Sequence, residues 1–108
     1  MARMRAMRLE RTGVVESASL ARVEVPEPEP GPGEVAIAVE ACGVCRTDLH
    51  LAEGEVSAPL PRVLGHQAAG RITAIVGEGV AGHSVGDAVG VGWMAFVDGS
   101  CRWCVSGR

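Results

Sequence analysis

The segment from Ala41 to His50, ACGVCRTDLH, concentrates two cysteines, an arginine, a threonine, an aspartate and a histidine. Zinc binds thiolate and imidazole, and a catalytic zinc keeps one position open for water or substrate. Cys45 and His66 come from separate segments and are candidate ligands of such a metal, although a lone histidine is often only a satisfied polar residue. A third protein ligand is needed. Cys42 is a candidate by spacing, but the turn at Gly43-Val44 can direct it elsewhere.

The residues that follow Cys45 can carry protons and orient a ligand. Thr47 and His50 are three apart, so on a helix they share a face. A hydroxyl near a metal-bound alcohol, with an imidazole behind it, can relay a proton to solvent. Asp48 can orient a metal-bound imidazole through its other ring nitrogen. For Thr47 and His50 the simpler interpretation, which the residues alone favour, is a helix cap and a surface histidine. For Asp48 it is a stabilising negative charge in the first helical turn.

A second group of donors lies in DGSCRWC and comprises Asp98, Cys101 and Cys104. A Cys-x-x-Cys pair on a glycine-flanked turn can bind zinc, but it is two ligands short of a closed tetrahedral site. Adding Cys42 and Cys45 gives two such pairs and describes a stand-alone zinc-binding or thiol module without enzymatic activity. The intervening segment 46–100 is far longer than the roughly 15 to 20 residues of a zinc ribbon, so this alternative is weak.

The composition describes one small globular domain. The chain has 108 residues, 47% hydrophobic and 21% charged, with a net charge of −3 and no basic bias toward nucleic acid. The N-terminus lacks the apolar run of a secretory signal. The longest uncharged stretch, 88–97, is about half of what a membrane helix requires. A cytoplasmic location is therefore the default, and there cysteines are more often metal ligands or free thiols than disulfides.

Abundant glycine and valine favour short strands joined by tight turns. PEPEPGPG at 26–33 excludes helix and inner strand and predicts an extended surface connection. Arg46 to Glu53 predicts a short helix that stops at Gly54. A loop is expected at 55–61 and a turn at 77–79. The expected strands are 7–10, 21–25, 35–39, 69–76 and 87–91. Together they predict a mostly β fold, a partly open β-barrel with one or two helical turns.

Three stretches in order, PGPGEVAIAVEACGVCRTDLH, LGHQAAGRITAIVGEGVAGHSVGDAVGV and CRWCVSGR, resemble zinc-dependent alcohol dehydrogenases of the medium-chain dehydrogenase/reductase superfamily. The resemblance covers nearly the whole chain and implies the GroES-like catalytic domain. It implies that Cys45 and His66 bind the catalytic zinc, that Asp48 supports His66, and that Cys42 is structural.

The resemblance also implies an enzymatic role for the start of the predicted helix. Thr47 would contact the alcohol hydroxyl and pass its proton toward His50. Arg46 would approach the cofactor pyrophosphate, where a guanidinium suits a phosphate. The zinc would stabilise the alkoxide so that hydride can leave for the nicotinamide of NAD or NADP. The expected reaction converts a small-molecule alcohol to an aldehyde or ketone, with no nucleic-acid or membrane partner.

Two positions depart from the family pattern. Gln67 stands where Glu usually follows the histidine ligand, and we expect altered zinc electrostatics or ligand exchange rather than lost binding. Asp98 stands where the first of four structural-zinc cysteines should be, before Cys101 and Cys104. A carboxylate can still ligate zinc, or the substitution marks a weakened or lost site.

The resemblance further predicts that 1–108 is an incomplete N-terminal GroES-like domain, with a structural-zinc lobe beginning near residue 93. The resemblance implies that the third catalytic ligand and the Rossmann domain lie further on in such a protein. The 108 residues alone should then be inactive, and the parent protein is expected to be a homo-oligomer. Two other readings are less supported: a GroES-like assembly module rests on fold analogy alone, and the Cys45–Asp48 and Gly65-His66 motifs argue against zinc-free quinone reductases.

Overall fold

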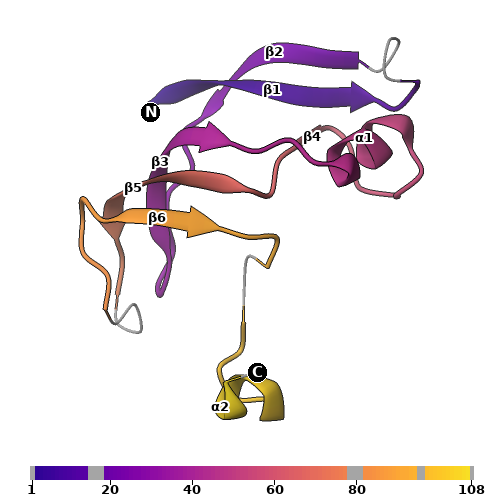
Figure 1. Cartoon of the computed structure of the whole chain (residues 1–108). Helices are drawn as coiled ribbons and strands as arrows, with labels where there is room; N and C mark the ends of the chain where they lie inside the picture. The colour runs from indigo at the N-terminus through magenta and orange to yellow at the C-terminus, as the bar shows by residue number, and fades with distance from the viewer. Residues whose placement is uncertain (1, 15–18, 78–81, 95–96, 108) are drawn as a thin grey trace.

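The computed structural model describes residues 2–14, 19–77, 82–94 and 97–107. Its elements follow one another through two small sheets, with a helix beside the sheets and a second helix near the C-terminus (Figure 1). They are β1 (Arg3–Arg11), β2 (Ser19–Pro26), β3 (Val35–Cys42), α1 (Arg46–Glu53), β4 (Arg62–Val63), β5 (Ala68–Ile75), β6 (Ala88–Val91) and α2 (Arg102–Ser106).

One sheet has the strand order β2-β1-β4 and is antiparallel throughout. The β1–β2 pairing runs from Arg3 opposite Pro26 to Arg11 opposite Ser19, with an irregularity between Leu9 and Arg11. The short β4 pairs with β1 around Leu9, and it brings the chain back from the loop that follows α1. Leu9 is 1% exposed, and it is the largest fully buried side chain of the described residues.

The other sheet has the order β3-β5-β6, also antiparallel. Its register places Cys42, at the end of β3, opposite Ala68, at the start of β5. Because the helix follows β3 and His66 precedes β5, this pairing draws the two candidate ligand segments to one end of the sheet. Gly70 must be glycine here, since a Cβ would overlap the backbone of Ala38 on β3.

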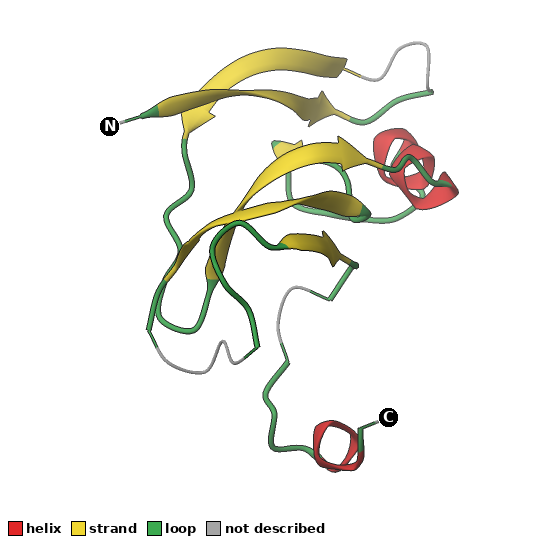
Figure 2. Ribbon diagram, turned by 60° about the vertical axis from the view of Figure 1, so that its left-hand side comes forward, coloured by secondary structure: helices red, strands yellow, loops and turns green. Residues whose placement is uncertain are grey.

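The proline-rich stretch 26–33 connects the two sheets as an extended segment, as expected (Figure 2). Backbone hydrogen bonds from Gly33 N–H to the Val76 carbonyl (2.8 Å) and from Val76 N–H to the Glu34 carbonyl (3.1 Å) hold its far end to the residue that follows β5. The sheets of the described residues do not close into a barrel. The expected mostly β, partly open architecture with short helical segments is therefore confirmed.

The predicted helix has the bounds that the structure shows, 46–53. The five expected strands are present, and the first three are longer than predicted. The predicted turn at 77–79 lies mostly outside the described residues. β4 and α2 were not predicted: β4 is two residues long and exists only through pairing with β1, and α2 is barely more than one turn.

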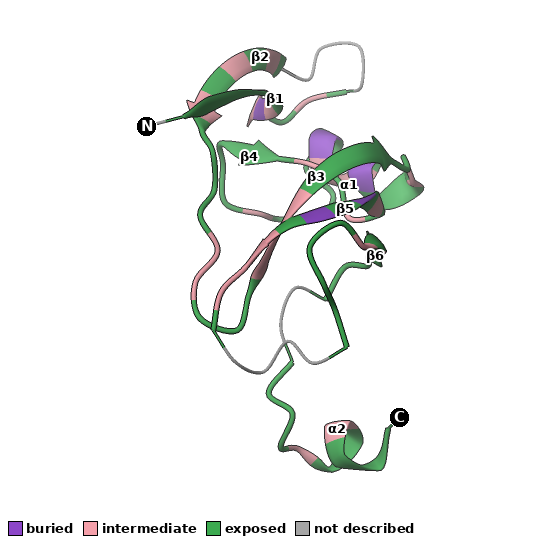
Figure 3. Cartoon of the chain, turned by 90° about the vertical axis from the view of Figure 1, so that its left-hand side faces the viewer, coloured by how far each residue is buried: buried purple, intermediate pink, exposed green. Residues whose placement is uncertain are grey.

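The core is small for a chain of this length. Leu9, Ala52 and Ile72 are the buried hydrophobic residues of the described ranges, and Asp48 is their buried polar companion (Figure 3). Many larger apolar side chains are exposed, among them Met7, Val39, Trp93 and Val105. No helix in the described part of the chain is long and apolar enough to cross a membrane.

Candidate functional site

The first turn of α1 organises the site. Cys45 is the N-cap residue, in extended conformation (φ −127°, ψ 172°), and its N–H donates to Asp48 Oδ2 at 3.1 Å. That bond satisfies one of the free amides that begin every helix. A carboxylate in the first turn also interacts favourably with the helix dipole. Asp48 therefore fixes the backbone from which the Cys45 thiol projects.

His66 reaches this turn from the segment between β4 and β5. Its Nε2 lies 3.0 Å from Cys45 Sγ, and both side chains are partly buried. Two features bring the segments together: the Gly43 N–H donates to the Gln67 carbonyl at 3.0 Å, and Gly65 adopts φ 119°, which a side chain would strain. A Cβ at Gly65 would also meet the Cys42 sulfur at 2.8 Å.

Asp48 also touches His66. Its Oδ1 lies 3.4 Å from His66 Nδ1, and this oxygen is buried without a hydrogen bond among the described residues. One carboxylate thus contacts both candidate ligands, the backbone of one and the ring of the other. A proton on Nδ1 would be shared with Asp48, which leaves the Nε2 lone pair free beside the Cys45 sulfur.

These donors fit a metal ion. The ligand atoms of Cys45, Asp48 and His66 all lie within 4.8 Å of one another. A soft thiolate and an imidazole, with a carboxylate behind the imidazole, is the donor chemistry that zinc proteins use. The unbonded Asp48 Oδ1 is the oxygen that an Nδ1–H would satisfy once Nε2 is committed to a metal. Cys42 is exposed and stands outside this group.

The remaining predicted residues of α1 lie on its accessible side. Arg46 and Thr47 are exposed in the first turn, and His50 is half-buried one turn later. Sequence reasoning missed Glu55, whose Oε2 lies 2.8 Å from His50 Nδ1. The signal was present as an acidic residue just past the predicted Gly54 stop. Only the backbone path after a helix end shows that this residue folds back toward His50.

The second donor group is also assembled. Asp98 Oδ1 accepts hydrogen bonds from the N–H groups of Ser100 (2.9 Å) and Cys101 (3.0 Å), and the Cys101 and Cys104 sulfurs are 3.5 Å apart. The ligand atoms of Asp98, Cys101 and Cys104 lie within 4.8 Å of one another. Backbone hydrogen bonds from Cys101 and Ser100 lower the pKa of Asp98. The backbone N–H of Cys104 lowers the pKa of Cys101.

The two groups of donors are separate. Each comprises its own three residues, and α2 lies apart from α1 (Figure 1). A site made from both Cys-x-x-Cys pairs is therefore not formed among the described residues.

Gln67 is exposed, and its Oε1 lies over Gly43, where a Cβ would meet it at 2.5 Å.

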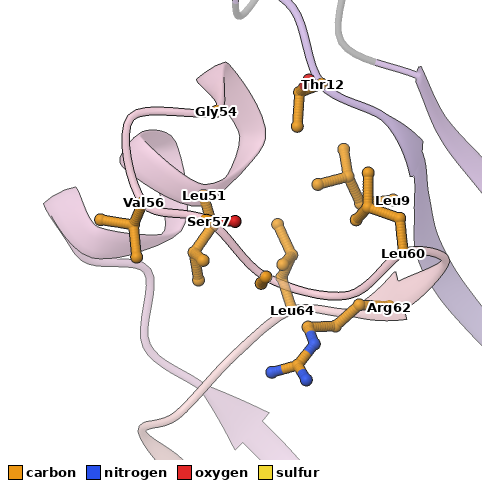
Figure 4. A pocket seen from close by; sticks show the side chains of 10 residues that line it. Leu9, Thr12, Leu51, Gly54, Val56, Ser57, Leu60, Arg62 and Leu64 are labelled. Atoms are coloured by element: carbon orange, nitrogen blue, oxygen red, sulfur yellow. The ribbon is translucent and has the colours of Figure 1, made fainter.

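A cavity of about 260 Å³ lies between β1, the C-terminal end of α1 and the loop that follows it (Figure 4). Its lining is mixed: apolar side chains such as Leu9, Leu51 and Leu64 lie with the polar Ser57 and Arg62. None of the candidate metal ligands lines it. The cavity therefore marks incomplete packing beneath α1 and is separate from the candidate metal centre.

The open two-sheet β fold, with a thiol–imidazole–carboxylate cluster at a helix start, is the arrangement expected of a GroES-like domain. A family model described as the alcohol dehydrogenase GroES-like domain matches residues 31–108. The chain therefore belongs to this family, and the resemblance seen in the sequence is confirmed.

Individual proteins agree with the family match. An NAD-dependent alcohol dehydrogenase from Saccharolobus solfataricus is 40% identical over 115 residues, covering 97% of this chain and 31% of that protein. The cobalt- and zinc-bound thermostable alcohol dehydrogenase from Pyrobaculum aerophilum is 39% identical with a TM-score of 0.78, covering 98% of this chain and 31% of that one.

A third protein, from Sinorhizobium meliloti 1021, is assigned as a zinc-binding dehydrogenase and was solved bound to NADP. It is 35% identical with a TM-score of 0.76, covering 100% of this chain and 30% of that one. The chain spans 25% to 32% of the length of the first curated relatives that it matches.

Proposed function

We propose that this chain is the metal-binding and proton-relaying part of a zinc-dependent alcohol dehydrogenase that uses NAD or NADP. The observation that carries the proposal is the Cys45–His66 pair, 3.0 Å from Sγ to Nε2, with Asp48 contacting both residues. The names of the relatives support the metal and the cofactor: one was solved with cobalt and zinc, one with NADP, and one is NAD-dependent.

Cys45 and His66 would hold the zinc, and Asp48 would keep the His66 ring in the orientation and tautomer that binding requires. Bound zinc supplies Lewis acidity, which lowers the energy of a negatively charged oxygen. Thr47 and His50 would then move the proton of the alcohol hydroxyl: the threonine oxygen receives it and the imidazole carries it toward solvent. Arg46, exposed beside them, would bind the cofactor pyrophosphate.

The activity, the small-molecule alcohol or aldehyde substrate, the homo-oligomeric parent and its cytoplasmic location belong to a longer protein of this family and are part of the proposal. So is the assignment of 1–108 as an incomplete domain whose structural-zinc lobe begins near residue 93. We further propose that Asp98, Cys101 and Cys104 bind a structural zinc in that lobe. Gln67 would alter the electrostatics near the catalytic zinc by replacing a charge with an amide.

Cobalt(II) titration of the chain tests the proposal, because thiolate–cobalt absorption reports each site. We expect two cobalt ions per chain, one after His66→Ala, and two after Cys42→Ser. An alcohol should perturb the spectrum of the His66-dependent site, because a catalytic metal keeps a position open for water or substrate. The stand-alone zinc module predicts the reverse: loss with Cys42→Ser, retention with His66→Ala, and no response to alcohol.

A further inference from the structure

Helix α1 carries a second pairing between a carboxylate and an imidazole, at its other end. Glu55 Oε2 lies 2.8 Å from His50 Nδ1, with the side chains 59% and 35% exposed. This nitrogen is itself shielded from solvent, and no well-aligned hydrogen bond reaches it within the described residues. At 2.8 Å the distance suits a hydrogen bond, so what is missing is the angle, which depends on the rotation of the ring.

The backbone places Glu55 beside His50. Gly54 ends α1 in the left-handed conformation (φ 84°), and the Glu55 N–H then donates to the His50 carbonyl at 2.9 Å. The same residue is therefore held to His50 by its main chain and faces it with its side chain. A hydrogen bond from the Gly13 N–H to the Ala52 carbonyl (2.9 Å) ties this end of the helix to the segment after β1.

We propose that Glu55 is the positioning residue of His50, and that its carboxylate holds the neutral imidazole with the proton on Nδ1. The inference rests on the proposed function, in which His50 receives the proton passed by Thr47. With Nδ1 protonated, Nε2 is the only ring nitrogen that can accept a proton. When it does, the Nδ1 proton can pass to Glu55 Oε2, and from this exposed carboxylate to water.

The Asp48–His66 pair supports this assignment, because it uses the same arrangement. In both pairs a carboxylate oxygen faces Nδ1 and leaves Nε2 for the chemistry. For His66 that atom faces the Cys45 sulfur. For His50 it would be the atom that takes up a proton.

Nitrogen-15 NMR of the chain at about pH 9, where histidine is neutral, tests the proposal, since long-range ¹H–¹⁵N correlations distinguish the two tautomers. We expect His50 to be mostly Nδ1–H, although the Nε2–H form predominates for histidine in water. Glu55→Ala should make Nε2–H the majority form. Glu55→Gln should preserve Nδ1–H in part, because the amide oxygen still accepts. Glu53→Ala removes a carboxylate from the same helix end and should change nothing.

A mostly Nε2–H His50 in the unmodified chain, or an unchanged tautomer in Glu55→Ala, would overturn the inference. The proposed function fails by a different result, since it requires cobalt binding that depends on His66. Glu55→Ala should leave that binding intact, so the two failures are distinguishable in the same samples.

Discussion

Asp48 is the single side chain on which the candidate catalytic site depends most. It is 8% exposed, it accepts from the Cys45 N–H, and it faces His66 Nδ1. A carboxylate in this position sets the tautomer of a metal-binding histidine and increases its basicity. A buried charge without such partners would be costly, so its location here is consistent with a role in the site.

Asp48→Asn should therefore weaken zinc binding about 10- to 100-fold, the range typical for the partners of metal-binding histidines. The amide has the size of the carboxylate and can still accept from Cys45, but it has no charge to offer the His66 ring. Competition with a chromophoric chelator measures the affinity. Glu53→Gln, which neutralises an exposed carboxylate of the same helix, serves as the control. Equal zinc affinities in the two variants would contradict the role given to Asp48.

Cys101 should be unusually reactive toward alkylation in the zinc-free chain. Its pKa lies below that of an ordinary thiol, first because the backbone N–H of Cys104 stabilises the thiolate and second because the Cys104 side chain does so. A lowered pKa means more thiolate at a given pH, so the midpoint of the alkylation rate against pH should lie below that of a cysteine in an unstructured peptide. Mass spectrometry of iodoacetamide-treated peptides follows the rate at each pH.

The Cys104→Ala variant separates the two causes, because it removes the neighbouring thiol and keeps the backbone N–H. We expect the Cys101 midpoint to stay below that of the peptide cysteine in this variant. A midpoint at or above that value would show that the Cys104 side chain, not its backbone, activates Cys101. Saturating zinc should abolish the alkylation if Cys101 is a ligand.

At the scale of elements, α1 was predictable because its signals are local. An acidic residue in the first turn and a glycine stop both lie within ten residues of the helix. β4 was not predictable, since two residues become a strand only by pairing with Leu9 and Arg8 on β1. The site shows the same division. Cys45 and His66 could be paired from their residue types and the family resemblance, whereas the position of Glu55 depends on the left-handed turn at Gly54.

That turn makes Gly54 a sensitive position. At φ 84° an L-residue costs roughly 1–2 kcal/mol, and a Cβ would also approach the Thr12 side chain at 3.3 Å. Gly54→Ala should lower the free energy of unfolding by about 1–2 kcal/mol, measured by urea denaturation. Gly92→Ala, where a Cβ meets nothing within 4 Å, should stay within about 0.5 kcal/mol of the original chain. Similar values for both variants would show that the helix end tolerates a side chain.

For the whole molecule, stability must come from more than the hydrophobic core. Only three hydrophobic residues of the described ranges are buried, and large apolar side chains remain exposed on both sheets. A metal held by Cys45 and His66 would link the start of α1 to the segment before β5. A metal that binds the folded chain and not the unfolded chain stabilises the folded state by mass action. The free energy of unfolding rises by about 2.7 kcal/mol when the free metal concentration is 100 times the dissociation constant.

Zinc should consequently raise the melting temperature by on the order of 10 °C, since 1 kcal/mol corresponds to about 4–8 °C in a domain of this size. Calorimetry in the Cys101→Ser/Cys104→Ser background isolates the contribution of the site at Cys45 and His66. In that background His66→Ala should lose the increase and Cys42→Ser should keep it. A melting temperature that zinc leaves unchanged, in a chain that binds cobalt normally, would mean that the unfolded chain binds the metal as tightly as the folded chain does. The site that the Gly43–Gln67 backbone bond and the Asp48 contacts build would then give the folded chain no advantage in binding metal.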